Sequence, residues 1–505
     1  MSHKILRALN PKGHCLLKRN FAFTQVAFKS DIAEILKEIR HIDRKKDDIL
    51  RQKQVEQLIN ALHQDMMSKP LDQPLFIQAV EEVITSIKPF LVRNPKYLEL
   101  IPLLCVPEQV HMFQVPWVDD NSLQRVNLGY RVQFNHALGP YKGGLRFHKS
   151  VDLSVVKFLG FEQIFKNALT GLPIGGGKGG ADFDPKGKSQ REIFKFCKSF
   201  MNQLIHYIGP DKDVPAGDIG VGAREIGYMY GHYNRLSKVF HGSMTGKGLG
   251  WGGSHLRPEA TGYGLIYITD CHLKHKNDSL ENKRCLVSGS GNVAQFAAEK
   301  LLHLKAKVLT MSDSNGTLYN VNGFTEKQLE ALAKLKDKRM RCKDLVEVFP
   351  EIQYYENETP WTIKKEADLA FPCATQNEIN RQDAVNLVEM KCKGVFEGAN
   401  MPSSVRAIYT YMNNNIDYIP AKAANAGGVA VSCLEMAQNS ARLVWKREKV
   451  DEMLKEIMQN IYVAISKKAE QLGHKGNLQL GANTVGFKRV ADAMFQQGTV
   501  FRPDT

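Results

Sequence analysis

Residues 284–301 read RCLVSGSGNVAQFAAEKL, an apolar run followed by a glycine-rich turn and an alanine-rich segment. The apolar run predicts a short buried strand, and the segment from Asn292 onward predicts a helix. Gly289 and Gly291 stand between them, where glycine permits a tight turn and lets backbone amides approach a pyrophosphate at the helix N-terminus. Ala294 replaces the third glycine of this pattern. The stretch predicts a dinucleotide-binding turn.

An acidic residue at the end of the next apolar run supports this interpretation. Asp313, in the triplet Ser312-Asp313-Ser314, stands where a carboxylate ordinarily binds the ribose 2′-hydroxyl. Read alone, that position favours NAD.

Short apolar runs alternate with helical segments through this half of the chain, as in a parallel sheet with crossover helices. A long amphipathic helix is predicted from Ser432 to Leu472, and a last one near 487–497. The glycine-dense segment 246–253 indicates a joint between domains. The apolar runs are Arg284–Ser288, Ala306–Ser312, Ala367–Phe371, Gly394–Phe396 and Ile416–Ile419.

The first half of the chain places three lysines and an aspartate in glycine-rich or tightly punctuated motifs. Lysine is strongly hydrated, so three lysines held where the backbone passes close by indicate a pocket for an anionic small molecule. The aspartate adds a candidate proton carrier. The four residues are Lys142 in PYKGG, Lys166 in FKNAL, Lys178 in GGGKGG and Asp218 in PAGDIG.

Two elements are expected to carry these residues. Alternating apolar positions between 125 and 138 predict a half-buried strand that leads to Lys142. A helix is predicted from about Ser154, a good N-cap, to Leu169. Gln163 and Lys166 are three residues apart on it and therefore face the same way.

The glycine-rich segment 175–180 does not fit a phosphate-binding P-loop. Leu172 stands where the first glycine is needed, and Gly179 stands where Ser or Thr would bind magnesium. A lysine enclosed by glycine backbone without a nearby countercharge is instead shifted toward its neutral form. Neutral Lys178 can activate water or stabilise a carbinolamine oxygen, and Asp218 can pass protons to and from a nitrogen.

Each of these residues also has an ordinary structural interpretation. Lys166 can pair with Glu162 one turn earlier on the same helix. Asp218 can be a turn residue beside glycine, and Ser432 can be a helix N-cap. Their occurrence together in several independent motifs favours the functional interpretation.

Composition excludes several classes of protein. A chain of 505 residues is too long for one core and fits two large domains. The net charge of +15 is spread along the chain, without the basic stripe that follows a nucleic acid, and no apolar run is long enough to cross a bilayer. Nine cysteines without C-x-x-C spacing argue against a disulfide framework and a zinc site, so no metal is implied.

The N-terminal segment differs from the rest. Residues 1–30 are basic and contain no acidic residue, which is typical of an organellar transit peptide, mitochondrial or other. A disordered basic tail on a cytoplasmic protein is the alternative. Isoleucines at three-four spacing then predict an extra charged helix over residues 31–55.

From about residue 56 to 500 the motifs resemble those of the glutamate dehydrogenases, of the short hexameric type, in the Glu/Leu/Phe/Val dehydrogenase family. The resemblance implies a catalytic lysine at Lys178 and a catalytic aspartate at Asp218. It implies a site for the substrate's side-chain carboxylate and another for its α-carboxylate. These are Lys142 with Ser432, and Lys166 with Gln163, respectively.

The resemblance also implies cofactor contacts. The segment 257–264 matches one whose threonine, here Thr261, contacts the nicotinamide amide together with Asn292. Asn400 belongs to a matching cofactor loop. NADP-using members keep the Ser-Asp-Ser triplet and place basic residues downstream, where Lys336 and Arg339 stand here. NADP is therefore expected, and NAD stays the alternative.

The implied architecture is a two-domain α/β fold with a cleft between the domains. Residues 56–250, completed by a C-terminal helix over 476–505, would bind substrate and build a homohexamer. Residues 251–475 would form the Rossmann-like dinucleotide-binding domain. The implied reaction is the reversible reductive amination of 2-oxoglutarate with ammonia to L-glutamate.

Two alternatives stay open. A related dehydrogenase acting on leucine, valine or phenylalanine would share Lys178 and Asp218 but line its side-chain pocket with apolar groups, which Lys142 and Ser432 oppose. A basic nucleic-acid-binding protein that kept the fold and lost the chemistry is opposed by the intact Lys178 and Asp218. Nucleic-acid affinity that collapses with added salt would indicate charge attraction alone.

Overall fold

The computed structural model describes residues 48–67, 73–338 and 340–499. The predicted transit peptide, residues 31–47 of the predicted charged helix, and Arg339 lie outside the described residues, so these stay predictions. The end of the charged helix falls within helix α2, Asp48–Met67. In the described part of the chain, no helix is long and apolar enough to span a membrane.

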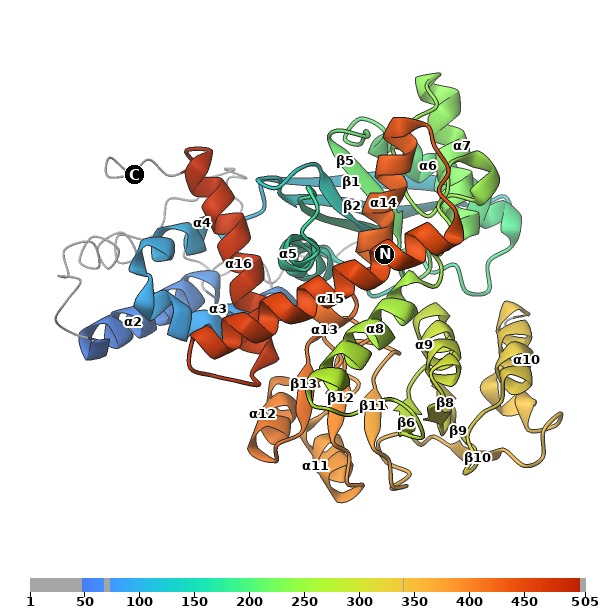
Figure 1. Ribbon diagram of the computed structural model, residues 1–505. Coiled ribbons are helices and arrows are strands. Elements are labelled where there is room, and N and C mark those ends of the chain that lie inside the picture. Colours follow the sequence, from blue (N-terminus) through green and yellow to red (C-terminus); the bar gives the residue numbers. More distant parts are fainter. Residues whose placement is uncertain (1–47, 68–72, 339, 500–505) are drawn as a thin grey trace, which may run out of the picture.

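A helical layer made from both ends of the chain covers one side of the molecule (Figure 1). Helix α3 buries an apolar stripe that includes Val80, Val83 and Ile87. The last helix, α16, returns to pack on α3 and on the helix that carries Lys166, and it is longer than predicted. The elements are α3 (Pro74–Arg93), η1 (Pro95–Leu100), α4 (Ile101–Leu104) and α16 (Leu478–Gln496).

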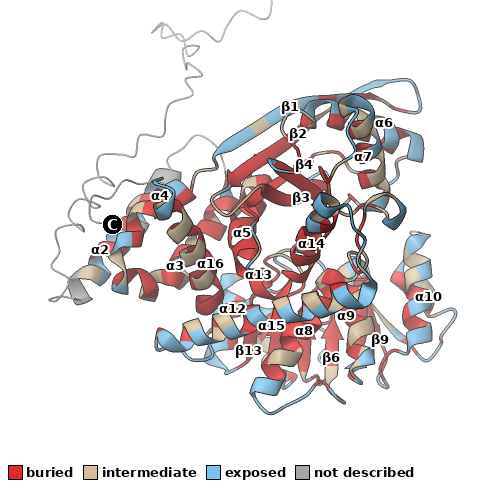
Figure 2. Cartoon of the chain, turned by 45° about the horizontal axis from the view of Figure 1, so that its top comes forward, coloured by how far each residue is buried: buried red, intermediate tan, exposed pale blue. Residues whose placement is uncertain are grey.

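The first sheet has five strands in the order β1-β2-β4-β3-β5, with β3 parallel to both of its neighbours. Helix α5 packs on one face, and α6 and α7 pack on the other. Strands β3 and β4 are buried throughout (Figure 2). The elements are β1 (Gln109–Val118), β2 (Gln124–Asn135), β3 (Tyr141–Phe147), α5 (Leu153–Leu169), β4 (Gly176–Ala181), α6 (Gln190–Leu204), β5 (Asp213–Gly217) and α7 (Ala223–Ser237).

The strand predicted over 125–138 is confirmed as β2, but its half-buried alternation is wrong. Its second half is buried on both faces, because helices cover both sides of the sheet there. The polar residues Arg131 and Gln133 are buried because both donate hydrogen bonds to the Asp213 carboxylate. Val126 and Leu128, predicted to face the core, are exposed.

Helix α5 is confirmed with a different cap. Asp152, not Ser154, is the N-cap, and its carboxylate accepts a hydrogen bond from the backbone N–H of Val155 at 2.8 Å. Both residue types cap helices well, so the sequence alone did not distinguish them.

The second sheet is parallel, as predicted, in the order β13-β12-β11-β6-β7. The predicted apolar run 306–312 divides between β7 and β8, and β8 leaves the parallel sheet to pair antiparallel with β9. These strands are β6 (Arg284–Val287), β7 (Lys307–Val308), β8 (Thr310–Asp313), β9 (Gly316–Tyr319), β10 (Gln353–Glu356), β11 (Leu369–Phe371), β12 (Gly394–Phe396) and β13 (Asp417–Ile419).

Crossover helices connect these strands, and together they make the Rossmann-like part of a two-domain α/β fold (Figure 1). The short helix η2 (Leu249–Trp251) lies in the glycine-dense segment that precedes α8. The helices are α8 (Ala260–His275), α9 (Asn292–His303), α10 (Glu326–Asp337), η3 (Cys342–Leu345), α11 (Arg381–Glu389) and α12 (Val405–Asn413).

The single long helix predicted from Ser432 to Leu472 is wrong. The chain forms α13 (Ala421–Ala424), α14 (Gly427–Ala441) and α15 (Arg447–Gln471). Arg442 adopts the left-handed conformation, with φ of 54°, and ends α14. Helix α15 packs on both α8 and α16, so it joins the two halves of the molecule (Figure 1).

Candidate active site

The register of strands β3, β4 and β5 gathers charged side chains on one face of the first sheet. Arg146 lies opposite Gly180 in the parallel β3–β4 pair. Side chains two residues apart in a strand share a face, so Lys178 points to the same side as Arg146 and Lys142. Helix α5 packs on β4, and its Gly160 lies beside Lys178 on this face.

Glycines let the backbones approach closely enough to build this face. A Cβ on Gly143 would lie 1.6 Å from the carbonyl oxygen of Gly177 on the neighbouring strand. A Cβ on Gly176 would lie 2.8 Å from the backbone of Ile164 on α5. The glycines therefore bring α5 onto the sheet and place its side chains beside Lys178.

Lys178 and Asp218 form an ion pair at the centre of this face. Lys178 is 2% exposed, and its Nζ donates to Asp218 Oδ1 at 2.9 Å. Arg146 Nε donates to the other carboxylate oxygen at 2.7 Å. The prediction that Lys178 has no nearby countercharge is wrong, because Asp218 supplies one from the end of β5.

The electrostatics leave both groups able to take part in proton transfer. Burial lowers the pKa of Lys178, and Asp218 opposes that shift. Burial alone would raise the pKa of Asp218, but Arg146 and Lys178 hold it below its usual range. An amine with a lowered pKa hydrogen-bonded to an ionised carboxylate is a suitable pair for moving protons to and from a substrate.

The side chains of α5 reach the same region. Lys166 Nζ donates to Asn400 Oδ1 at 2.8 Å, so α5 contacts the loop after β12. Burial first, and then the charge of Lys178, lower the pKa of Lys166 to about 8. Gln163 Nε2 donates to Asn167 Oδ1 at 2.6 Å, also in a buried position.

A second cationic position lies beside α14. Lys142 is 1% exposed, and burial first, then Arg257 and Arg131, lower its pKa well below the ordinary value. Among the residues that the structure describes, no carboxylate forms an ion pair with its ammonium. Its amine is therefore available to an anionic ligand, whose charge would favour the ammonium form.

Ser432 is linked to the surroundings of Lys142 through Arg257, which was not predicted as a site residue from the sequence. Ser432 lies inside α14, so the alternative that it is a helix N-cap is wrong. Its Oγ accepts a hydrogen bond from Arg257 Nε at 2.8 Å. Arg257 stood in a matched segment, but its spacing gave no sign that it would meet residues 142 and 432. A second omission, Arg146, could have been found from its period-two spacing with Lys142.

Helix α14 is held in place by a buried ion pair with the glycine-dense segment. Lys247 Nζ donates to Glu435 Oε1 at 2.6 Å, and the backbone N–H of Gly246 donates to Glu435 Oε2 at 3.0 Å. Glu435 lies one turn after Ser432, so this contact fixes the orientation of the serine.

The glycine-rich turn has the geometry of a dinucleotide site. Gly289 has φ of 87°, in the left-handed region, and its N–H donates to Ser312 Oγ at 2.8 Å. Gly291 is the N-cap of α9, and a Cβ there would meet nothing within 4 Å, so the start of the helix is open. Asn292 is exposed at the first position of α9. These residues fit a dinucleotide pyrophosphate.

Thr261 lies at the start of α8, which packs on α9, the helix that follows this turn. A Cβ on Gly428 would lie 2.3 Å from Thr261 Oγ1, so the threonine packs on the glycines that begin α14. Gly262 brings α8 against α9, because a Cβ there would lie 2.5 Å from the backbone nitrogen of Ala297. Thr261 therefore lies on a helix that packs on both α9 and α14.

The carboxylate of Asp313 forms its hydrogen bonds within the protein. It accepts backbone hydrogen bonds from Asn315 and Cys342, both at 2.9 Å, and Lys336 Nζ lies 3.7 Å away. Arg341 Nη1 donates to Ser314 Oγ at 3.2 Å. Arg341 was not predicted from the sequence, because only the turn after α10 brings it back to the triplet.

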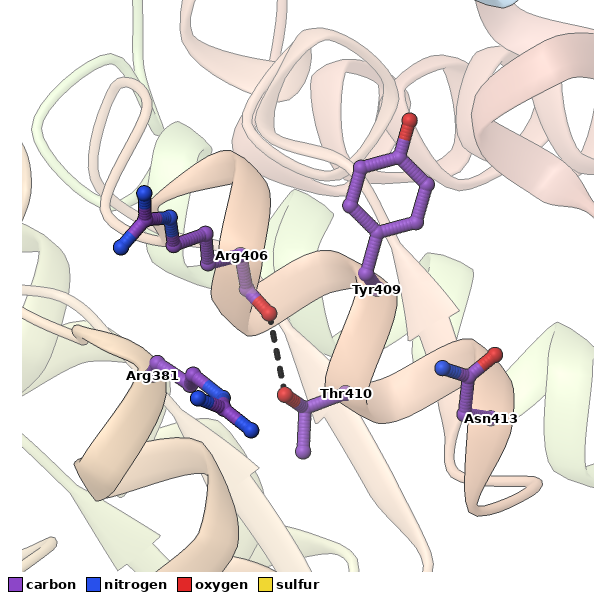
Figure 3. Close-up of a pocket in the computed structure, with 5 residues that line it drawn as sticks. All are labelled: Arg381, Arg406, Tyr409, Thr410 and Asn413. Carbon is purple, nitrogen blue, oxygen red and sulfur yellow. Dashed lines mark hydrogen bonds between the residues drawn. The ribbon is translucent and has the colours of Figure 1, made fainter.

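Residues of α11 and α12 line a hollow (Figure 3). Arg381 and Arg406 line it with Tyr409, and Thr410 Oγ1 donates to the carbonyl oxygen of Arg406 at 2.9 Å. Neither helix carries a predicted site residue.

Family models match both halves of the chain. Residues 107–235 match "Glu/Leu/Phe/Val dehydrogenase, dimerisation domain", and residues 252–498 match "Glutamate/Leucine/Phenylalanine/Valine dehydrogenase". Together these models cover both the substrate-side lysines and the dinucleotide turn.

Similar proteins agree with the family models. An NADP-specific glutamate dehydrogenase of Giardia intestinalis is 55% identical over 84% of this chain and 95% of that protein. The NAD(P)-specific enzyme of Xylanibacter ruminicola is 53% identical over 84% of this chain and 96% of its own length.

The fold is that of a solved structure. A glutamate dehydrogenase of Plasmodium falciparum aligns with a TM-score of 0.87 and 53% identity, covering 91% of this chain and 98% of that one. The lysine–aspartate pair, the two outlying lysines and the glycine-rich turn all lie within the matched residues. The chain belongs to the glutamate/leucine/phenylalanine/valine dehydrogenase family.

Proposed function

We propose that this protein is an NADP-dependent glutamate dehydrogenase that catalyses the reversible reductive amination of 2-oxoglutarate with ammonia. The observation that carries this proposal is the Lys178–Asp218 pair, with cationic Lys142 and Lys166 as two separate anchors near it. A dicarboxylate needs two such anchors, because each charged hydrogen bond fixes one end of the molecule. The similarity to enzymes named as NADP-specific glutamate dehydrogenases supports the same activity.

The residues of this chain divide the work as follows. Lys142, Ser432 and Arg257 bind the side-chain carboxylate, and Lys166 and Gln163 bind the α-carboxylate. Lys178 donates a proton to the carbonyl oxygen as ammonia adds, and it accepts a proton when water attacks in the reverse direction. Asp218 passes protons to and from the nitrogen.

The dinucleotide would be held by Gly289, Gly291 and the start of α9, with Thr261, Asn292 and Asn400 on its nicotinamide side. The reduced nicotinamide supplies hydride to the substrate α-carbon when it is bound. Burial of Lys178 and Lys142 keeps water from both cations, which strengthens their interaction with the substrate.

The preference for NADP rests on the surroundings of the Ser-Asp-Ser triplet. Asp313 already accepts two backbone hydrogen bonds, so it is a poor partner for a ribose hydroxyl. Lys336 and Arg341 add positive charge beside Ser314, which suits a 2′-phosphate. Arg339, proposed from the sequence, belongs to the same basic segment.

Initial rates with 2-oxoglutarate and ammonium test the activity and the cofactor together. We expect turnover with NADPH and a kcat/KM at least about tenfold lower with NADH, the effect of one lost charged contact. Arg341→Ala should reduce that preference, whereas Arg381→Ala, at the start of α11, should leave it unchanged. The absence of turnover with both cofactors would reject the proposal. A preference for NADH would indicate that Asp313 determines the cofactor specificity.

Replacing Lys142 by leucine should change substrate selection. Loss of the cation should raise KM for 2-oxoglutarate by about 10²-fold, since a charge-assisted contact disappears from a buried site. The KM for an apolar 2-oxo acid should change far less. Equal effects on both substrates would favour a dehydrogenase for leucine, valine or phenylalanine.

The pH dependence of substrate binding should reflect Lys166. Its ammonium is charged below a pKa of about 8 and loses its proton above that value, so anion binding weakens as pH rises. With free ammonia held constant, kcat/KM for 2-oxoglutarate should fall roughly tenfold per pH unit well above pH 8. Lys166→Arg should flatten this limb, because arginine keeps its charge. A limb that stays unchanged in that variant would assign the titration to another group.

We further propose a homohexamer. An apolar patch on the outer face of β1 and β2 supports it: Met112 is 64% exposed and Val126 is 59% exposed, beside Val110 and Leu128. Large exposed apolar surface of this kind is typical of a subunit interface.

We also propose domain boundaries near residues 56, 250 and 475. The basic, acid-free composition of residues 1–30 supports the further proposal that they direct the protein to an organelle.

A further inference from the structure

Lys422 is a buried cation with no place in the reaction described above. It lies on α13 and is 3% exposed. Its Nζ lies 3.0 Å from Glu82 Oε1 on α3 and 3.0 Å from Glu162 Oε1 on α5. Gln479 of α16 also donates to Glu82, at 3.2 Å. Lys422 thus contacts α3 and α5 of the substrate side directly, and α16 contacts the same Glu82 carboxylate through Gln479.

This cation keeps its charge. Burial would lower the pKa of Lys422, but Glu162 and Glu82 together raise it above its ordinary value. A buried ammonium held by two carboxylates stays protonated across the working pH range, so it neutralises Glu162 at all relevant pH values.

Glu162 has a second possible partner on its own helix. It stands four residues before Lys166 on α5, the spacing and order in which a glutamate and a lysine pair best. The structure does not use this pair. Lys166 Nζ donates instead to Asn400 Oδ1, at 2.8 Å.

The segment that carries Lys422 also supports Asn400. Asn425 follows α13 directly, and its Nδ2 donates to Asn400 Oδ1 at 3.1 Å and to the carbonyl oxygen of Gly398 at 3.2 Å. Residues 422–425 therefore bind both Glu162, whose carboxylate could pair with Lys166, and Asn400, whose side-chain oxygen accepts the hydrogen bond from Lys166.

We propose that Lys422 is a positioning residue that binds Glu162 and so keeps it from pairing with Lys166, whose ammonium then remains available to the substrate α-carboxylate. This inference rests on the proposed function, since it assumes that Lys166 binds 2-oxoglutarate. Without Lys422, the buried Glu162 would lack a cation, and Lys166 one turn away would be the nearest replacement.

The test compares the steady-state kinetics of four variants with those of the wild-type full-length protein. Lys422→Met should raise KM for 2-oxoglutarate about tenfold, because the substrate must now displace Glu162, while kcat changes less than threefold. Lys422→Arg keeps the cation and should leave KM within about threefold of wild type. Glu162→Gln should have little effect on KM.

The double variant separates positioning from structural support. Adding Glu162→Gln to Lys422→Met removes the competing carboxylate and should restore KM to near the wild-type value. A merely structural role would reduce the fraction of active enzyme, and hence the apparent kcat, and would leave KM unchanged. A KM that stays high in the double variant would overturn the proposal.

Three further outcomes keep the test decisive. If Lys422→Met does not fold, Glu162→Gln is compared with the double variant, and equal KM values are expected; a higher KM in the double variant would show that Lys422 acts without Glu162. Active wild type with unchanged KM in Lys422→Met would reject this inference alone. Inactive wild type would reject the proposed function, and this inference with it.

Discussion

Replacing Lys178 by methionine will lower kcat by about 10³–10⁴-fold, the range expected when a positioned proton donor is lost. Methionine fills a similar volume in the buried face, so the sheet should keep its packing. The KM for 2-oxoglutarate should change little, because Lys142 and Lys166 provide the anchors. Steady-state rates at saturating substrate give the result directly.

Lys178→Arg is the matched control for this variant. Arginine preserves the positive charge beside Asp218 but does not release its proton near neutral pH. If proton transfer is the role of Lys178, the arginine variant should be nearly as inactive as the methionine variant. Substantial activity in Lys178→Arg would mean that the charge alone stabilises the reaction.

Replacing Asp218 by asparagine will lower kcat by about 10²–10³-fold, because the amide no longer carries a proton to or from the nitrogen. The change also alters the pH profile. Asp218 raises the pKa of Lys178 against the effect of burial, so its loss lowers that pKa further. In oxidative deamination, where neutral Lys178 must accept a proton, the acid limb of kcat should therefore move to lower pH.

Asp182→Asn serves as the control for a lost carboxylate on the same sheet. Asp182 follows β4 and accepts hydrogen bonds from Asn127 and the backbone of Leu128, away from Lys178. It should leave kcat within about twofold of wild type, as is usual for a substitution away from the reacting groups. An equal loss of kcat in both variants would indicate damage to the sheet rather than to proton transfer.

The sequence predicted the parts of the fold that depend on local spacing. The turn at Gly289 and Gly291, the strand before it and the helix after it need only neighbouring residues, and all three are present. The break between α14 and α15 was not predicted because no glycine or proline stands there. Arg442 ends α14 with a positive φ instead.

The contacts of the site depend on residues far apart in the chain, which spacing does not reveal. Asp218 was found as a candidate, but its pairing with Lys178 comes from the parallel register of β3 with β4 and β5. Arg257 meets Ser432 only because α14 packs on α8. Lys422 and Glu162 are in contact but lie far apart along the sequence, so no motif could connect them.

Strand β2 was predicted to be buried on one face only for a similar reason, because the partner of its polar residues is distant in the sequence. An alternating pattern predicts one buried face, but the buried ion pair of Arg131 with Asp213 lets polar residues occupy the second face of a fully covered strand. Arginine and glutamine read as solvent-facing from sequence because their partner is about eighty residues away.

A labelled turnover tests the central claim most directly. The protein is incubated with 2-oxoglutarate, ¹⁵N-ammonium and NADPH deuterated at the transferring position, and the product is analysed by mass spectrometry. We predict L-glutamate that carries both ¹⁵N and one deuterium at its α-carbon, and almost none with Asp218→Asn in the same period. Deuterated 2-hydroxyglutarate without ¹⁵N would show reduction without amination and would contradict the roles assigned to Lys178 and Asp218.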